Sequence, residues 1–401
     1  MGRIRGAAAL AAAAAVAGTF VAGPASAQTA RPESYVGSAA GSALDLSVLS
    51  LPKLSLGVST AKATSLPTAV AEGTGALGIA GTTAHAEVAS GGSDVKPQTC
   101  AVPVGVAGIL DVGLACGTAS ASIASGNPSA TSEGSVASVD IAGQNLLNSV
   151  APITDAVTGT VGGALTTLCG ALSLTCPVTG TVSDVLNSVV STDTLQVAAG
   201  TSKSSVVAAA GTVTATATSQ GAEIKLLPLP QVGGVTSGEP LATITVGTAT
   251  ATAVYNRATG VATPTVDPAL VTVKLNTLLT NALGVGQTIT VPVGTSLIVP
   301  GTEGTPLETE IVAAAGHTTT NPDGTVTAVS DAVKIHALKG ISGGILLDLA
   351  HAEAGVGGTV AVAGPPPAEL PHTGGTPWMP LAGSGLLGAA ILVRRLRVRE
   401  D

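Results

Sequence analysis

Large aromatic side chains and methionine are nearly absent from this chain. Its 401 residues include one Phe, one Trp, two Tyr and two Met. A domain without large rings must fill its interior with Val, Leu, Ile and Ala, so its structural elements must approach one another closely. Few aromatic platforms remain on which sugars or bases could stack. The composition therefore disfavours aromatic-lined carbohydrate recognition, while hydrogen-bonded recognition stays open.

Charge is also scarce. Charged residues make up 10% of the chain, with 16 Lys and Arg against 24 Asp and Glu, for a net charge of −8. Nucleic-acid binding needs clustered Lys and Arg, and acid–base catalysis needs ionisable side chains. The sequence also lacks a phosphate-binding glycine loop, an EF-hand loop and an H-E-x-x-H motif. We expect no nucleic-acid partner, no cofactor and no enzymatic activity.

The first 27 residues have the organisation of a secretion signal. Arg3 and Arg5 give a positively charged start, and an apolar run follows. Ala25 and Ala27 are the small residues that signal peptidase accepts, and this pattern argues against a permanent N-terminal membrane helix. We expect a signal peptide over residues 1–27 that is removed by signal peptidase.

The other end of the chain carries a short motif, an apolar run and a basic tail. The motif is Leu370-Pro371-His372-Thr373-Gly374, the apolar run covers residues 378–393, and four arginines follow it. The apolar run suits membrane insertion, and the arginines hold the tail on the cytoplasmic side. This ordered set resembles the LPxTG sorting signal of Gram-positive surface proteins of the high-GC type.

The resemblance implies a substrate of sortase. Leu370 and Pro371 would shape the extended recognition peptide, and sortase would cleave between Thr373 and Gly374. A peptidoglycan amine would then form an amide bond with Thr373, leaving the protein attached covalently to the cell wall. The hydrophobic segment and basic tail over residues 375–401 would insert in the membrane only transiently. The expected localisation is secreted and anchored at the cell-wall surface.

The displayed region lies between the two signals. Residues 28–363 form the expected ectodomain, and residues 364–369 form a proline-rich, extended spacer that keeps the motif at residues 370–374 accessible. After both cleavages, Lys and Arg fall from 16 to 10 and Asp and Glu from 24 to 22, so the net charge changes from −8 to −12. The acidic product further disfavours nucleic-acid binding.

Four cysteines occur, at Cys100, Cys116, Cys169 and Cys176. An even number in an exported chain indicates two disulfides. Three pairings are possible, and we favour Cys100–Cys116 with Cys169–Cys176 because each pair is local. A metal site is the weaker interpretation, because the spacings are not C-x-x-C and thiols oxidise outside the cell.

Alternation of Thr or Ser with Ala or Val points to β-strands. It is clearest at residues 117–124, 211–218 and 247–255. A period of two residues is the strand signature, and Thr and Val suit a pleated surface. Turn-forming residues indicate hairpins or loops at residues 126–128, 219–221, 256–260 and 321–324. The prediction is a mostly β fold with an antiparallel β-sandwich-like ectodomain.

A loose similarity also recurs along the chain. An apolar pair, a small residue and then alternating Ala, Ser or Thr occur at residues 77–87, 112–122, 244–252 and 346–354. Because the spacing is irregular, we interpret these segments as recurring long strands and not as a solenoid. Residues 145–161 and 184–190 space their apolar residues more like helices. We therefore expect a small α-helical insertion near residues 143–195.

Two short patterns could suggest a catalytic serine. G-x-S-x-G occurs at residues 340–344, followed by Asp348 and His351. These spacings place both partners on the next strand, so Ser342 is expected in a glycine-rich turn and not at a nucleophile elbow. S-x-x-K occurs at residues 50–53 and 59–62 without its usual companion motifs, and we interpret both occurrences as chance.

Ala-His-Ala-Glu occurs twice, at residues 84–87 and 350–353. Residues two apart share a strand face, so each His lies beside its Glu. If the two strands paired, His85, Glu87, His351 and Glu353 could converge on a divalent metal. The alternative is two solvated strand faces, and we expect no metal.

We expect a structural or adhesive protein anchored to peptidoglycan. The alternatives are a secreted, wall-associated hydrolase and a surface-layer component that assembles by edge-to-edge strand pairing.

Overall fold

The computed structural model describes residues 33–48, 53–77, 79–101, 104–106, 110–142, 193–228, 240–277, 280, 284–300, 302–304, 308–339 and 344–360. These residues belong to one compact unit, Pro32–Val362. The predicted signal peptide, spacer, sorting motif and tail lie outside the described residues, as does most of the predicted helical insertion.

The described residues form two antiparallel sheets, which we call sheet I and sheet II. Sheet I contains β1 (Ser34–Val48), β2 (Leu54–Thr64), β3 (Thr68–Ala76), β4 (Thr83–Val88), β18 (Ser296–Ile298), β19 (Glu310–Val312), β20 (Gly316–Thr320), β21 (Val326–Ser330), β22 (Val333–Ala337) and β23 (Ile345–Thr359). Sheet II contains β5 (Gly92–Ala101), β6 (Val104–Val106), β7 (Leu110–Val112), β8 (Ala115–Ala124), β9 (Asn127–Ala142), β10 (Asp193–Ala208), β11 (Thr212–Gln220), β12 (Glu223–Pro228), β13 (Pro240–Val246), β14 (Ala249–Asn256), β15 (Ala262–Asp267), β16 (Val271–Leu275) and β17 (Thr288–Val291).

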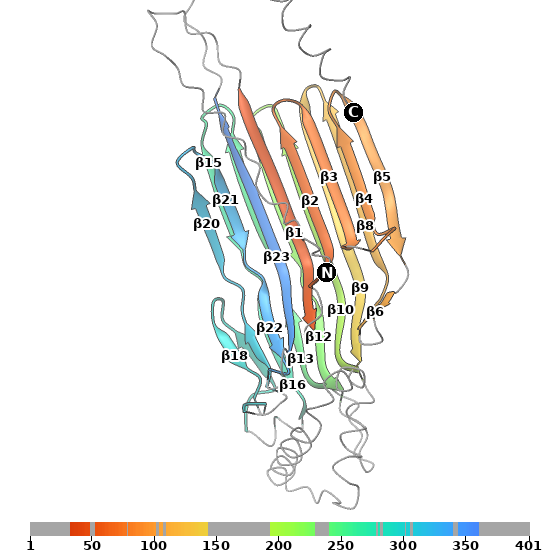
Figure 1. The fold of residues 1–401 in the computed structure, drawn as a ribbon. Coiled ribbons are helices and arrows are strands. Elements are labelled where there is room, and N and C mark those ends of the chain that lie inside the picture. The colour runs from red at the N-terminus through yellow and green to blue at the C-terminus, as the bar shows by residue number, and fades with distance from the viewer. Residues whose placement is uncertain are drawn as a thin grey trace, which may run out of the picture. The chain divides into compact units, whose positions relative to one another are not determined.

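The two sheets pack face to face (Figure 1). β1 contacts β10, β2 contacts β9, β3 contacts β8, and β23 contacts β14 across the interface. The predicted antiparallel, sandwich-like β fold is therefore confirmed for the described residues. No helix among them is long and apolar enough to cross a membrane.

Strict alternation of side chains explains why these segments form strands. In β11 the valine and alanines at positions 213, 215 and 217 are buried, and the intervening threonines face outward. The predicted strands at residues 117–124, 211–218 and 247–255 correspond to β8, β11 and β14. β-branched Thr on the outer face and small Ala on the inner face fit a half-buried pleated surface.

Several strands are interrupted at one common level, which we call the crease. It separates β11 from β12 at residues 221–222 and β21 from β22 at residues 331–332. β12 and β11 both pair with β10, with Leu226 opposite Leu195 and Gln220 opposite Thr201, so the register is unchanged across the gap. β22 and β21 follow one register along β23 in the same way. These separate strands are therefore segments of longer strands that cross the whole sheet.

The buried face shifts by one residue at the crease. In β23 the buried residues before the crease are Leu347 and Leu349, and those after it in the chain are Ala350 and Ala352. Ala350 has a φ of 58° and Gly57 in β2 has a φ of 59°, so both lie in the left-handed region. Such a residue re-aims the side chains that follow it without ending the ladder.

The crease divides the sandwich into two halves with different cores. The bulky half comprises β7, β12, β13, β16, β19, β22 and the adjoining ends of β1, β2, β9, β10 and β23. The small-residue half comprises β3, β4, β8, β11, β14, β15, β20, β21 and the other ends of the same long strands. The largest fully buried side chains of the bulky half are Leu44, Leu46, Leu56, Ile141, Leu195, Ile224, Ile244, Leu275, Ile311 and Ile335.

The small-residue half brings the two sheets unusually close. A Cβ atom added at Gly73 would lie within 3.0 Å of backbone atoms of Thr118 and Glu133 in sheet II. One added at Gly117 would meet the carbonyl oxygens of Gly73 and Thr82 at a similarly short distance. Face-to-face sheets normally lie about 10 Å apart because side chains separate them. Here backbone meets backbone, as the lack of large side chains led us to expect.

Three of the four predicted turns reverse the chain. Residues Ser125 and Gly126, with φ of 51° and 76°, join β8 to β9. Residues 256–260 join β14 to β15, and residues 321–324 join β20 to β21. Residues 219–221 do not form the predicted connection between antiparallel strands. They lie at the crease, where a short break leads into β12 along the same neighbour, β10.

The crease also explains the loose sequence similarity. The segments at residues 112–122, 244–252 and 346–354 each begin with large apolar residues in the bulky half and continue with alternating small residues beyond the crease. The segment at residues 77–87 instead leads into β4. The predicted helical insertion is wrong at its C-terminal boundary, because β10 already begins at Asp193. Residues 143–192 of that prediction lie outside the described residues.

Candidate functional site

The sorting and processing residues cannot be placed. Ala25, Ala27, Leu370, Pro371, Thr373 and Gly374 lie outside the described residues. The ectodomain strands that lead to these signals are described, however. β1 and β23 pair along their whole length, and Ser34 stands opposite Thr359, with 2.7 Å between their hydroxyl oxygens. The first and last strands of the ectodomain therefore begin and end side by side at the small-residue end.

A partly buried arginine cluster holds the beginning of β1. Arg257 donates to both carboxylate oxygens of Glu33, with Nη2 2.8 Å from Oε2. Its guanidinium lies 5.0 Å from the centre of the Tyr35 ring, and its Nη1 donates to Asn127 Oδ1 at 3.2 Å. Bidentate pairing to a carboxylate and stacking on an aromatic ring are geometries that suit arginine. The cluster joins β1 of sheet I to hairpins of sheet II.

The pKa shifts of Arg257 and Tyr35 reflect their positions in this cluster. The hydrogen bonds that Arg257 donates to Glu33 raise the pKa of Arg257, and burial raises the pKa of Tyr35. Only 19% of the Arg257 side chain is exposed, so the cluster is partly shielded from solvent. No local sequence pattern indicates this cluster, because Arg257 and Glu33 are 224 positions apart.

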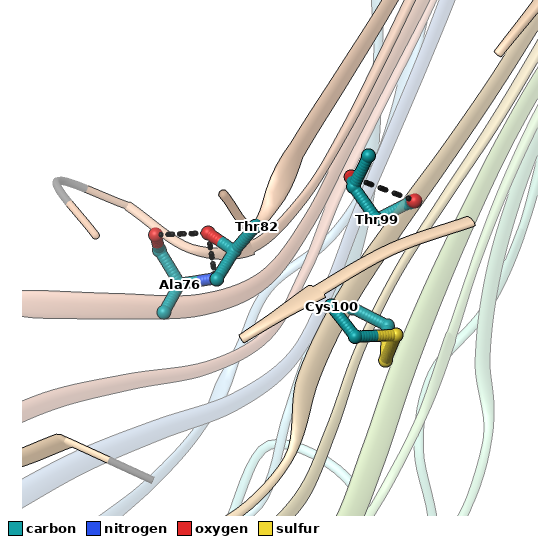
Figure 2. The surroundings of a disulfide bond; sticks show 6 residues. Ala76, Thr82, Thr99 and Cys100 are labelled. Carbon is teal, nitrogen blue, oxygen red and sulfur yellow. Dashed lines mark hydrogen bonds between the residues drawn. A yellow bond between two sulfur atoms is a disulfide. The ribbon is translucent and has the colours of Figure 1, made fainter. Parts of the chain in front are cut away.

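The predicted disulfide between Cys100 and Cys116 is confirmed. The two residues stand directly opposite each other in β5 and β8, with a Cα–Cα distance of 4.1 Å. Figure 2 shows the bond together with Thr82, whose hydroxyl donates to the carbonyl of Ala76 at 2.9 Å. The bond closes a separation of 16 residues at the edge of sheet II. Cys169 and Cys176 lie outside the described residues.

The serine motifs do not form a catalytic centre in the described part of the chain. Ser342 and Ser50 lie outside it. Asp348 and His351 are both on β23, as the spacing predicted. Ser59 is buried between the sheets, whereas Lys62 is exposed on the opposite face of β2, so this S-x-x-K pair cannot act together.

The two His–Glu pairs do not converge. β4, which carries His85, and β23, which carries His351, are separated by β1, β2 and β3 in sheet I. His85 lies 3.4 Å from Glu72 and 3.7 Å from Glu87, on the exposed face. The four-ligand metal site would require β4 and β23 to pair, and these strands do not pair. Among the described residues, no group of three or more His, Cys, Asp or Glu side chains could hold a metal ion.

A polar cluster that the sequence did not predict lies on the outer face of the bulky half. Asp45 and Asp348 stand directly opposite each other in β1 and β23. Lys53 Nζ lies 2.9 Å from Asp45 Oδ2 and 3.9 Å from Asp348 Oδ2. The hydrogen bond to Asp45 raises the pKa of Lys53, so the lysine stays charged and offsets the repulsion between the carboxylates.

A small apolar gap lies in the core of the bulky half. A gap of about 10 Å³ lies among Leu195, Leu226 and Ile345. That volume is about the minimum for one water molecule, and its lining is apolar. This space does not have the size of a small-molecule site.

Comparisons with known proteins do not assign a family. No family model matches the chain, and no curated protein matches it. Among solved structures, the crystal structure of the Pseudomonas putida toluene transporter TodX aligns with 81% of this chain and 87% of its own, at 8% identity and a TM-score of 0.13. Similarity at this level supports no inference about fold or function.

Proposed function

We propose that this protein is exported, attached to peptidoglycan through Thr373 and displayed as a structural or adhesive protein of the cell wall. The observation that carries the proposal is the ordered C-terminal set of LPHTG motif, apolar run and four arginines. The signal-peptide pattern supports export. The disulfide between Cys100 and Cys116 suits an oxidising, extracellular location.

The position of β23 in sheet I fits a tethered protein. This strand leads toward the spacer at residues 364–369, and it is paired with β1 on one side and with β21 and β22 on the other. A tether at its end would therefore pull on a strand that is hydrogen-bonded along both sides. An edge strand would offer only one ladder to resist the same pull.

An adhesive or structural role accounts for the described residues better than a hydrolase does. Asp348 and His351, the candidate partners of Ser342, lie in β23, in the interior of sheet I. The surface-layer alternative is disfavoured at two described edges of sheet II, β5 and β15. Edge strand β5 contains Lys96, Pro97 and an irregular register, and edge strand β15 contains Pro264. Prolines, lysines and bulges at an edge oppose edge-to-edge pairing.

Residues 143–192 remain part of the proposal as a small helical insertion between β9 and β10. We propose that this insertion also contains a second disulfide, between Cys169 and Cys176. Peptide mapping of the unreduced protein would find the two cysteines in one linked fragment. Two free thiols at these positions would remove the second disulfide.

The anchoring test uses the full chain in a Gram-positive host that has sortase. Wild-type protein is expected in the fraction released by cell-wall digestion, with its C-terminal peptide ending at Thr373 and carrying a peptidoglycan fragment. The Thr373→Ala variant is expected to be absent from the fraction released by cell-wall digestion. His372→Ala is the matched control, because it changes the variable position of the motif and should anchor normally.

Two results would contradict the proposal. One is wild-type protein that stays in the detergent fraction with residues 374–401 intact, whether or not the sortase gene is present. The other is equal anchoring of the Thr373→Ala variant and the His372→Ala control.

A further inference from the structure

A regular group of threonines covers one flank of the outer face of sheet II. Register places Thr216, Thr252 and Thr265 in one row across β11, β14 and β15. The rows on either side contain Thr218 with Thr250, and Thr214 with Thr263. We call these seven residues the threonine array: Thr214, Thr216, Thr218, Thr250, Thr252, Thr263 and Thr265. Only Val254 and Asp267 interrupt the three-by-three grid.

The array is confined to these three strands. The central row continues into the neighbouring strands as Ser205 in β10, Thr131 in β9 and Ser120 in β8. The adjacent row continues with the charged residues Lys203 and Glu133. The outer face of sheet II has the same strand geometry throughout. Strand propensity alone therefore does not explain why threonine predominates on β11, β14 and β15, whereas serine and charged residues occur on β8, β9 and β10.

Hydroxyl groups on the two faces of sheet II also differ in their partners. On the inner face, Ser202 Oγ donates to the carbonyl of Gly57 at 2.6 Å, and Ser204 Oγ donates to that of Ser59 at 3.1 Å. In the described ranges, the hydroxyls of the threonine array have no hydrogen-bond partner in the protein. They remain available to a partner outside the chain.

The spacing of the array defines the kind of partner. Alternate residues of a strand repeat every 6.6 to 6.8 Å or so, and neighbouring strands lie about 4.7–4.9 Å apart. Threonine is restricted at χ1, so each hydroxyl and methyl group can occupy only a few positions. The resulting surface is periodic in two directions and carries one charged side chain, Asp267, at its corner. It fits a periodic, uncharged lattice of hydrogen-bonding groups.

We propose that the threonine array binds the surface of ice. Water oxygens on the faces of hexagonal ice repeat at two spacings close to those of the array, and ice presents both donors and acceptors without charge. Crystalline polysaccharide is disfavoured, because the array contains no aromatic ring on which a sugar could stack. Ice binding is a property of the displayed domain itself, so it does not depend on anchoring through Thr373.

The test measures ice recrystallisation and uptake of purified full-length protein into a growing ice hemisphere. Wild-type protein is expected to enter the ice and to suppress recrystallisation. Thr252→Tyr, at the centre of the array, is expected to reduce the suppression at least tenfold. Thr131→Tyr is the matched control, because it lies in the same row on β9 and outside the array. It should retain activity within twofold.

Thr265→Lys provides a second variant on the exposed edge strand β15. Thermal melting must show that each variant folds as the wild type does. The proposal is overturned if wild-type protein is excluded from ice like serum albumin. Equal losses in Thr252→Tyr and Thr131→Tyr would also overturn it, as would sedimentation with crystalline cellulose combined with exclusion from ice.

Discussion

The bulky half and the small-residue half use the same long strands but join their sheets in different ways. In the bulky half, buried Leu and Ile side chains fill the interface, and removal of apolar area from water supplies the attraction. In the small-residue half, the interface is lined mainly by buried Ala, with Tyr255 as a large exception, and most positions provide less apolar area. There the backbones themselves come into contact, which favours dispersion and weak Cα–H···O contacts.

Buried serines complete the interface of the small-residue half. Ser132 Oγ donates to the carbonyl of Thr60 at 2.7 Å, and Ser219 Oγ donates to that of Ser42 at 2.8 Å. Ser202 and Ser204 do the same near Gly57 and Ser59. A hydroxyl is small enough for the close approach and satisfies its own hydrogen bond by reaching the opposite sheet. The comparison shows that close sheet packing selects residues by size first and by polarity second.

Adding volume to the small-residue half should cause the largest loss of stability. Gly117→Val would place a side chain against the carbonyl oxygens of Gly73 in β3 and of Thr82, just before β4. Backbone atoms cannot rotate away as a side chain does, so we expect a loss of more than about 3 kcal/mol in the free energy of unfolding. Denaturant titration followed by circular dichroism measures it.

The control for volume is Gly211→Val. Nothing lies within 4 Å of a Cβ atom added at Gly211. Its stability should change by less than about 1 kcal/mol. If both variants lose similar stability, the sheets are not in close contact at Gly117.

Removing volume should instead damage the bulky half. Leu56 is fully buried, and Leu56→Ala is expected to lower stability by about 2–5 kcal/mol because apolar contacts are lost and a cavity remains. Leu66→Ala, in the hairpin between β2 and β3, is the control. Leu66 is 81% exposed, so its replacement should change stability by less than about 0.5 kcal/mol. A loss below that level for Leu56→Ala would contradict the assignment of a tightly packed Leu and Ile core.

Local pattern was sufficient to predict much of the fold. Alternation at residues 211–218 and 247–255 predicted β11 and β14, and local spacing predicted the disulfide between Cys100 and Cys116. The crease was not predicted, because a one-residue shift of the buried face looks in the sequence like an irregular repeat. The turn residues at 219–221 were misread for the same reason.

Tertiary register determines the features that sequence pattern missed. Asp45 and Asp348 meet only because β1 pairs with β23 across most of the chain. Arg257 reaches Glu33 by an equally distant contact. The threonine array was visible as alternation within each strand, but its rows depend on how β11, β14 and β15 are aligned. Spacing along one strand carries no information about such alignment.

The serine contacts provide a finer test of the small-residue half. Ser202→Ala removes the hydrogen bond to Gly57 and leaves buried polar groups with fewer partners. We expect a loss of about 1–3 kcal/mol in unfolding free energy. Ser205→Ala on the outer face of the same strand is the control and should stay within about 0.5 kcal/mol of wild type. Equal effects of the two substitutions would show that the inner hydroxyls do not stabilise the interface.

The smallest expected effect concerns pH at the flank of the small-residue half. Asp94 in β5 pairs with Lys96 at 2.9 Å and accepts a hydrogen bond from the backbone amide of Glu87 in β4. The bond to Lys96, followed by that to Glu87, lowers the pKa of Asp94 from its ordinary value of 3.8. Its contribution to stability is therefore present above that value and is lost as the pH falls through the lower folded-state pKa.

Hydrogen exchange at the Glu87 amide measures this effect. Acidification below about pH 4 is expected to reduce protection of this amide, after correction for the intrinsic exchange rate. Asp94→Asn keeps an acceptor but does not titrate there, so its protection should follow no such acid step. An identical step in the variant would assign the loss of protection to a group other than Asp94. The bulky half, whose core excludes charge, should keep its protection through the same pH range.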